Sequence, residues 1–215
     1  MSDMFGEEKL AQLRADIRQN MSAYRLAHTL GVERMAARLA ALYCPEKEGM
    51  LRAAALLHDI TKECPEDWQR RLMADHGIVL RADEAASPKI FHGITAAAVI
   101  PCRYPAFADS ELISAVRWHT TGRADMTLTE ALVYLADYIE EGRRFADCVL
   151  LREMFWGADP ATMDGAARHA HLVSVLCRSL DLTLASLEAE GAPVCLDTLA
   201  AREDLKQKIT LLKGT

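Results

Sequence analysis

The 215-residue chain is long enough for one domain with a sizeable core, and its 51% hydrophobic and 26% charged residues are typical of a soluble globular protein. A formal net charge of −6 argues against broad electrostatic attraction to nucleic acid or an anionic membrane, although a local basic pocket is compatible with it. No apolar run approaches the roughly 18 residues that a membrane-spanning helix needs.

The six cysteines are scattered and form no Cys-x-x-Cys pair, which favours reduced, mostly packing thiols over a disulfide framework or a zinc site. Residues 1–8 show no basic segment followed by an apolar one, so we expect no signal peptide. We therefore expect a cytoplasmic protein without nucleic-acid or membrane partners.

Helical periodicity dominates the chain, whereas strand-like alternation is almost absent. The expected helices span Glu7–Gln19, Ser22 to near Tyr43, Glu48–Asp59, Cys64–Gly77, His92–Ile100 (closed by Pro101 and Pro105), Asp109–Gly122, Thr127–Glu141 (closed by Gly142), Asp147–Trp156, Pro160 to about Glu188, and Asp197–Leu212. We expect a single all-α domain of roughly eight to ten helices. Its motif-bearing core covers residues 22–145, with C-terminal helices over 147–215 packed on it.

The stretch Leu56–Lys62 places His58 and Asp59 at the end of a strongly apolar helix. Burying unpaired charge is costly, so these two side chains need partners. A metal ion would suit both, because imidazole and carboxylate are ligands and the cation offsets the negative charge. The alternative is a histidine–aspartate pair that only caps the helix, and the dipeptide alone does not decide between the two.

Four other candidate ligands lie on other expected helices: His28, His92, His119 and Asp137. Each alone is more often a satisfied core or capping residue than a ligand. Asp137 is the most informative, because its helix is largely apolar and a buried carboxylate needs a partner. The remaining histidines, His76, His169 and His171, lack such a setting and are expected to be structural or solvated.

The order of these six residues resembles the ligand order of dinuclear HD-domain phosphohydrolases. The match covers Tyr24–Arg143 and narrows to the YqeK branch, whose members are symmetrical bis(5′-nucleosyl)-tetraphosphatases that split diadenosine tetraphosphate into two ADP. The segments similar to that branch are Arg25–Val32, Leu56–Lys62, His92-Gly93, His119–Arg123 and Ala136–Arg143. Two departures are Glu141, where the family usually has proline, and Cys195-Leu196, where histidine-proline is common.

The resemblance implies a metal site built from these ligands. His28, His58 and Asp137 would hold one ion, His92 and His119 the second, and Asp59 would bridge them. The resemblance implies iron, while four imidazoles and two carboxylates equally allow manganese or zinc and disfavour magnesium. Two ions about 3.5–4 Å apart can share a hydroxide that attacks phosphorus.

Cations close to these ligands in sequence are candidates for binding phosphate oxygens. We expect this role for Arg25, Lys62, Arg123 and Arg143, joined by Thr120 and Thr121 on the turn before Gly122, and we expect Asp59 and Lys62 to be catalytic. The alternative for each cation is a solvated charge at a helix end. Trp118 and Tyr138 are candidates for stacking on a base, but aromatic residues at helical spacing are more often core.

The sequence thus predicts metal-dependent hydrolysis of nucleoside polyphosphates, specifically the symmetrical cleavage of diadenosine tetraphosphate by a metal-bridging hydroxide. The expected partner is a dinucleoside polyphosphate, and a homodimer is a candidate assembly. Alternatives are another HD phosphohydrolase (a nucleotidase or deoxynucleotide triphosphohydrolase) and a non-catalytic nucleotide-sensing module. A structural helical adaptor leaves the buried ionisable residues unexplained.

Overall fold

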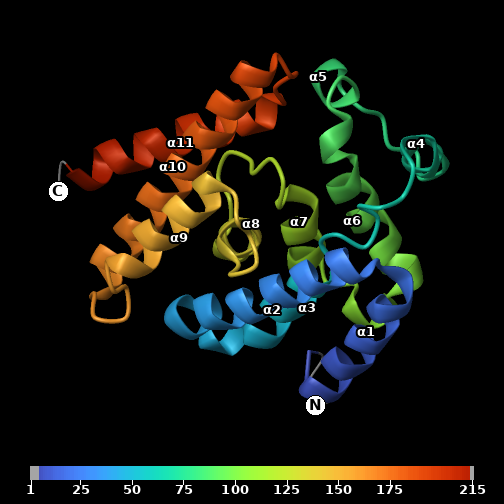
Figure 1. Cartoon of the computed structure of the whole chain (residues 1–215), viewed down its shortest axis with the longest axis horizontal. Helices are drawn as coiled ribbons and strands as arrows, with labels where there is room; N and C mark the ends of the chain where they lie inside the picture. Colours follow the sequence, from blue (N-terminus) through green and yellow to red (C-terminus); the bar gives the residue numbers. More distant parts are fainter. Residues whose placement is uncertain (1–4, 214–215) are drawn as a thin grey trace.

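The computed structural model describes residues 5–213, and within this range it contains α- and 3₁₀-helices and no strand. Residues 1–4, which open the segment expected to hold no signal peptide, lie outside the described range. The α-helices are α1 (Glu7–Asn20), α2 (Ala23–Tyr43), α3 (Glu48–Leu57), α4 (Glu66–Asp75), α5 (Ala82–Ala85), α6 (Phe91–Arg103), α7 (Ser110–Trp118), α8 (Leu128–Ile139), α9 (Ala146–Gly157), α10 (Gly165–Glu190) and α11 (Leu196–Lys213) (Figure 1). The predicted all-α class is confirmed.

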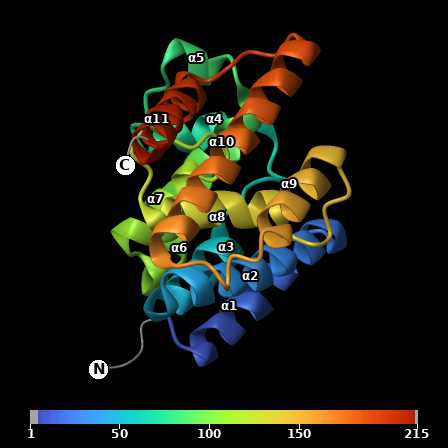
Figure 2. The same cartoon turned by 90° about the vertical axis from the view of Figure 1, so that its left-hand side faces the viewer.

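The middle of the bundle is formed by α3 and α8, which contact each other and both pack against α2 and α7. In Figure 1, α9, α10 and α11 lie together on the left and α4, α5 and α6 on the right. Figure 2 shows α10 crossing in front of α8, which it contacts. The consecutive residues Ala53–Leu57 of α3 are all fully buried, since small alanine side chains let the neighbouring helices approach on every side.

Capping side chains define where several helices begin. The Ser22 hydroxyl accepts the Arg25 N–H at 3.1 Å at the start of α2. Asp109 accepts two backbone N–H groups at the start of α7, at 2.8 and 3.1 Å. Thr127 and Glu130 form the predicted capping box of α8. These helices therefore begin where the sequence predicts, because the caps satisfy N–H groups that have no partner inside the helix.

The end of α3 differs from the prediction. The helix stops at Leu57, so His58 and Asp59 lie in the turn that follows it and not in its last turn. The ring of His58 forms a hydrogen bond from Nδ1 to the carbonyl of Ala55 at 2.6 Å. This contact satisfies a carbonyl at the helix end and fixes the side chain that leaves it.

The end of α8 also lies earlier in the sequence than predicted. It ends at Ile139, whereas the prediction extended it to Glu141 with Gly142 as its cap. Glu140 leaves the helix in an extended conformation, with φ −58° and ψ 149°, and its carboxylate lies near His28. The end of α8 thus coincides with a contact between residues far apart in the sequence.

Two other boundaries need correction. Pro101 does not close α6 but lies within it, and the helix continues to Arg103. A proline so near the C-terminal end removes only one of the last backbone hydrogen bonds. The helix α10 begins at Gly165 and not at Pro160, because Asp164 is its N-cap and accepts a backbone N–H at 2.8 Å.

One helix departs from the expectation that no segment is apolar enough to cross a membrane. By length and composition alone, α10 could do so, and 39% of its most apolar window is buried inside the protein. The same helix packs against α8, α9 and α11. Core helices of soluble proteins pass the same test, so this single helix is weak evidence for a membrane span.

Candidate metal centre

Five separate parts of the fold deliver ionisable side chains to one place. His28 lies within α2, His58 and Asp59 follow α3, His92 is in the first turn of α6, His119 follows α7, and Asp137 is in the last turn of α8. The structure thus brings together all six side chains that the sequence predicts as ligands.

Asp59 occupies the middle of this cluster and is buried. Its Oδ2 atom lies 3.2 Å from His58 Nε2 and 3.7 Å from His28 Nε2. Its Oδ1 atom lies 3.3 Å from His92 Nε2 and 3.7 Å from His119 Nε2. One carboxylate therefore faces two pairs of imidazoles with its two oxygens, as a bridging ligand would.

Two groups within the cluster have ligand atoms close enough together to hold a metal ion. One comprises His28, His58 and Asp137, and the other comprises His58, Asp59 and His119, each with its ligand atoms within 4.8 Å of one another. His92 adjoins the second group, with its Nε2 atom 3.0 Å from that of His119. The second group also includes His58, which the family resemblance assigns to the first ion alone.

The chemistry of the donors fits a metal. The Nε2 atoms of His28 and His58 are buried and have no hydrogen-bond partner, which is costly for polar atoms unless something else binds them. Three of the four rings are held by the other nitrogen, as is usual for metal-ligating histidines. The Nδ1 contacts are to Glu140 Oε1 for His28 (3.2 Å), the Ala55 carbonyl for His58 (2.6 Å) and the Val116 carbonyl for His119 (2.7 Å).

The electrostatic surroundings keep both carboxylates ionised. Burial alone would raise the pKa of Asp59, but the adjacent His58 and His119 hold it well below its usual range. Burial would likewise raise the pKa of Asp137, yet Arg143 and His28 hold it well below that range. Ionised carboxylates are the form that binds a cation.

The histidines divide into two kinds. Burial lowers the pKa of His92 and of His119, so both rings are neutral at pH 7 and have a lone pair for a metal. For His28, burial lowers the pKa, but the nearby carboxylates of Asp137 and Glu140 outweigh it and raise the pKa to about 9.

Three of the predicted phosphate-binding cations lie against the cluster. Arg25 Nη1 is 2.5 Å from Asp59 Oδ2, and Arg143 forms an ion pair with Asp137 Oδ1. Lys62 Nζ lies 3.2 and 3.3 Å from the two ring nitrogens of His92, and its burial lowers its pKa. Positive charge therefore surrounds the buried ligands.

The residues after α7 divide differently from the prediction. The Thr120 hydroxyl lies 3.1 Å from both His92 Nε2 and His119 Nε2. Thr121, by contrast, is buried and donates to the Gly122 carbonyl at 2.8 Å. Arg123 pairs with Glu130 of the α8 capping box, at 3.1 Å, and not with any of the six ligands. Among the three, Thr120 is the one that the fold brings to the ligands.

The two aromatic candidates for base stacking have other contacts. The Arg117 guanidinium lies over the Trp118 ring, 4.1 Å from its centroid. The Tyr138 hydroxyl is 3.2 Å from Thr183 Oγ1 of α10, and its ring packs against Tyr134. Both arrangements match the alternative of aromatic residues that pack within the fold.

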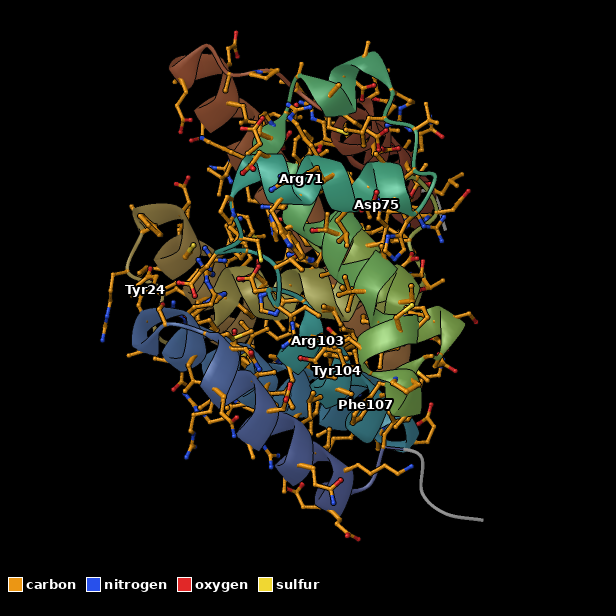
Figure 3. The ribbon with its side chains drawn as sticks, turned by 90° about the vertical axis from the view of Figure 1, so that its right-hand side faces the viewer. Tyr24, Arg71, Asp75, Arg103, Tyr104 and Phe107 are labelled. Carbon is orange, nitrogen blue, oxygen red and sulfur yellow. The ribbon has the colours of Figure 1, made fainter. Side chains whose placement is uncertain are left out.

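A different aromatic residue is exposed close to the ligands. Tyr24 is 73% exposed at the start of α2, one turn before His28, and Figure 3 shows it at the edge of the molecule. Its ring lies 5.9 Å from the guanidinium of Arg25, which pairs with Asp59. No periodic pattern singles this residue out, because it occupies a solvent-facing helical position.

Comparison with known proteins places the chain in a family. The HD domain matches residues 25–142, which contain all six candidate ligands, and the chain belongs to the HD-domain family. Hydrolases of this family are metal-dependent, and the two residue groups described above could hold a metal.

Named relatives narrow the comparison. The chain is 27% identical to the symmetrical bis(5′-nucleosyl)-tetraphosphatase of Bacillus subtilis over 86% of this chain and 90% of the relative. It is 32% identical to the enzyme of the same name from Staphylococcus aureus, over 64% and 69% respectively. These relatives confirm the resemblance predicted from the spacing of the motifs.

A solved structure shares the fold. The crystal structure of a predicted HD superfamily hydrolase involved in NAD metabolism, from Clostridium acetobutylicum, superimposes with a TM-score of 0.79 at 28% identity. The superposition covers 92% of this chain and 97% of that one. The likeness therefore extends beyond residues 25–142, the range of the HD match.

Proposed function

We propose that the protein is a metal-dependent hydrolase that cleaves diadenosine tetraphosphate symmetrically into two ADP. The observation that carries this proposal is the position of Asp59, whose two oxygens face separate pairs of imidazoles. The names of the relatives support the choice of substrate.

We propose the following ligands for two divalent ions. His28, His58 and Asp137 would hold one ion, His92 and His119 would hold the second, and Asp59 would contribute to both. Iron is the proposed metal, and the donor set also suits manganese or zinc. When bound, a pair of such ions supplies Lewis-acid activation of the phosphoryl group and of water.

The chain's own cations bind and neutralise the substrate. Phosphoryl transfer depends mainly on positioning and on stabilising charge that spreads over the phosphoryl oxygens. Arg25 and Arg143 are partly exposed and lie beside Asp59 and Asp137, so their guanidinium groups can reach the polyphosphate. Lys62, half-buried beside His92, places its Nζ close to the candidate ligands, and Thr120 offers a hydroxyl there.

The bond changes follow from symmetrical products. The oxygen of water forms a bond to one of the two inner phosphorus atoms, and the bond from that phosphorus to the central bridging oxygen breaks. One ADP leaves with that oxygen, the attacked half becomes the second ADP, and the reaction releases a proton to solvent.

Product analysis tests the proposal. Metal-loaded protein is incubated with diadenosine tetraphosphate, and the nucleotides are separated by chromatography. We expect two ADP for each substrate consumed and no ATP. The formation of AMP with ATP, or the absence of hydrolysis, would refute the proposed activity.

The structural relative motivates a second candidate, hydrolysis of another nucleotide by the same site. That relative is described as involved in NAD metabolism. The same chromatographic assay, run with a panel of mononucleotides, deoxynucleoside triphosphates and dinucleotides at equal concentration, separates the candidates. Faster turnover of any of these than of diadenosine tetraphosphate would favour the second candidate.

We also propose a cytoplasmic protein that binds neither nucleic acid nor a membrane, and that forms a homodimer. The six free cysteines and the net charge of −6 support the first two statements. Exposed leucines of α11, including Leu199 and Leu211, offer apolar surface to a second copy.

A further inference from the structure

Glu140 is a buried carboxylate with no part in the ligand set. It is 2% exposed and lies in the loop directly after α8. Its Oε1 atom is 3.2 Å from His28 Nδ1, and its Oε2 atom accepts the Gly142 N–H at 2.6 Å. The carboxylate therefore contacts the Nδ1 edge of the His28 ring, on the side of the ring away from the cluster.

Two glycines provide the space for this carboxylate. A Cβ atom at Gly31 would lie 2.3 Å from Glu140 Oε2, and one at Gly142 would lie 2.9 Å from the same oxygen. Gly31 occupies the interior of α2, where glycine is less favourable than almost any other residue. A glycine at such a position is consistent with a requirement for close approach to Glu140.

The backbone around Glu140 is fixed from outside the HD match. Arg152 of α9 donates hydrogen bonds to three carbonyls of this loop, those of Ile139, Glu140 and Arg143, at 2.9, 2.8 and 2.8 Å. The guanidinium thus stabilises the extended backbone that turns Glu140 towards His28.

We propose that Glu140 is a positioning residue that fixes the His28 ring so that Nε2 is presented to the metal. The His28 Nε2 atom lies 3.0 Å from Asp137 Oδ1, is buried and has no hydrogen-bond partner. A carboxylate on the other nitrogen sets the orientation of a ligating imidazole and increases its basicity. The inference rests on the proposed metal ligands and extends them to Glu140, Gly31 and Arg152.

The competing explanation is that Glu140 only stabilises the fold. The two roles differ in what they change, because a structural role alters the stability of metal-free protein and leaves metal affinity intact. A positioning role lowers metal affinity, typically about 10–100-fold for an outer-shell partner. The measurement is therefore Mn²⁺ affinity, determined by competition with a chelator on protein shown by circular dichroism to be folded.

Glu140→Ala and Glu140→Gln form the main pair of variants. We expect the alanine variant to bind the ion that His28 would hold about 10–100-fold more weakly than wild-type protein does. The glutamine variant keeps an acceptor oxygen for His28 Nδ1, so it should lose less. Wild-type affinity in folded Glu140→Ala protein would overturn the proposal.

Glu33 is a matched control on the same helix as His28. It is also buried, but it pairs with Arg14 and Arg52 and contacts none of the ligands. We expect Glu33→Ala to lower stability and to keep wild-type Mn²⁺ affinity. An equal loss of affinity in Glu33→Ala and Glu140→Ala would show that general destabilisation is responsible and would contradict the proposal.

Gly31→Ala tests the proposal even if the Glu140 variants do not fold. Alanine favours the helix, but its Cβ would displace the Glu140 carboxylate while keeping its charge. We expect weaker Mn²⁺ binding, and unchanged binding would overturn the inference. The metal-binding assay uses no substrate, so its result is independent of the proposed activity. Wild-type protein that binds Mn²⁺ but does not cleave diadenosine tetraphosphate would refute the proposed function and would not affect this inference.

Discussion

At the residue scale, the proposed chemistry depends most on Asp59. A buried carboxylate between four imidazoles is ionised because its neighbours outweigh the cost of burial. Its two oxygens lie close to different pairs of histidines, and a side chain with a single ligand atom could not contact both pairs in this way. Replacing it by a neutral amide would retain its shape but remove the charge that two cations can share.

The thiol of Cys195 gives a residue-scale prediction of pH dependence. Burial and the nearby carboxylate of Asp197 raise the pKa of Cys195 from its ordinary value of 9.0 to about 11. At pH 8 only about one molecule in 1,000 is then a thiolate, the reactive form. We expect iodoacetamide to modify the exposed Cys102 first and to spare Cys195, as measured by mass spectrometry of peptides.

The same shift affects stability with a definite sign. The protonated thiol of Cys195 makes its full contribution to the free energy of unfolding below pH about 9, and this contribution is lost as the pH rises through about 11.

The labelling experiment also has an outcome that would contradict the raised pKa of Cys195. That outcome is an equal labelling rate for Cys102 and Cys195 in folded protein at pH 8.

Five of the six candidate ligands lie at or just after a helix end, and His28 lies further inside α2. His58 and Asp59 follow α3, His119 follows α7, and His92 opens α6. A helix can direct a side chain at its end into a shared space while its apolar face remains in the core. The rings of His58 and His119 also bind the carbonyls of Ala55 and Val116 through Nδ1, so the ends of α3 and α7 hold these rings in place.

The cap at the start of α7 gives a prediction at the scale of the element. Asp109→Ala leaves the N–H groups of Glu111 and Leu112 without their acceptor. We expect the free energy of unfolding to fall by about 1 kcal/mol, measured by urea denaturation. Asp109→Asn, which keeps an acceptor, should lose less than half of that amount, and equal losses in the two variants would argue against a capping role.

At the scale of the molecule, local signals predicted the start of most helices. Ser22, Asp109 and Thr127 form hydrogen bonds within one turn of themselves, so sequence alone locates them. The short helix Ala82–Ala85 was missed, because four residues are too few for a periodic pattern. The ends of α3 and α8 were each predicted two residues too late, because no periodic pattern marks the turn at His58 or the contact of Glu140 with His28.

For the candidate site, the sequence predicted which residues gather but not all of the contacts that they make. Residue types and spacing, together with the family resemblance, predicted six candidate ligands, and the fold brings these six side chains together. The contact of Glu140 with His28 spans 112 positions in the sequence and has no local signal. The pairing of Arg123 with Glu130 was also not foreseen, although Glu130 was identified as part of the capping box.

The most direct test of the bridged site is the metal content of wild-type and Asp59→Asn protein. Both proteins are purified anaerobically, and their metals are measured by inductively coupled plasma mass spectrometry. We expect two ions per wild-type chain and fewer in the variant. We also expect ADP release by the variant to fall more than about 100-fold, beyond the loss typical of outer-shell residues. Asp59→Asn protein that keeps two ions and wild-type ADP release would contradict the central role of Asp59.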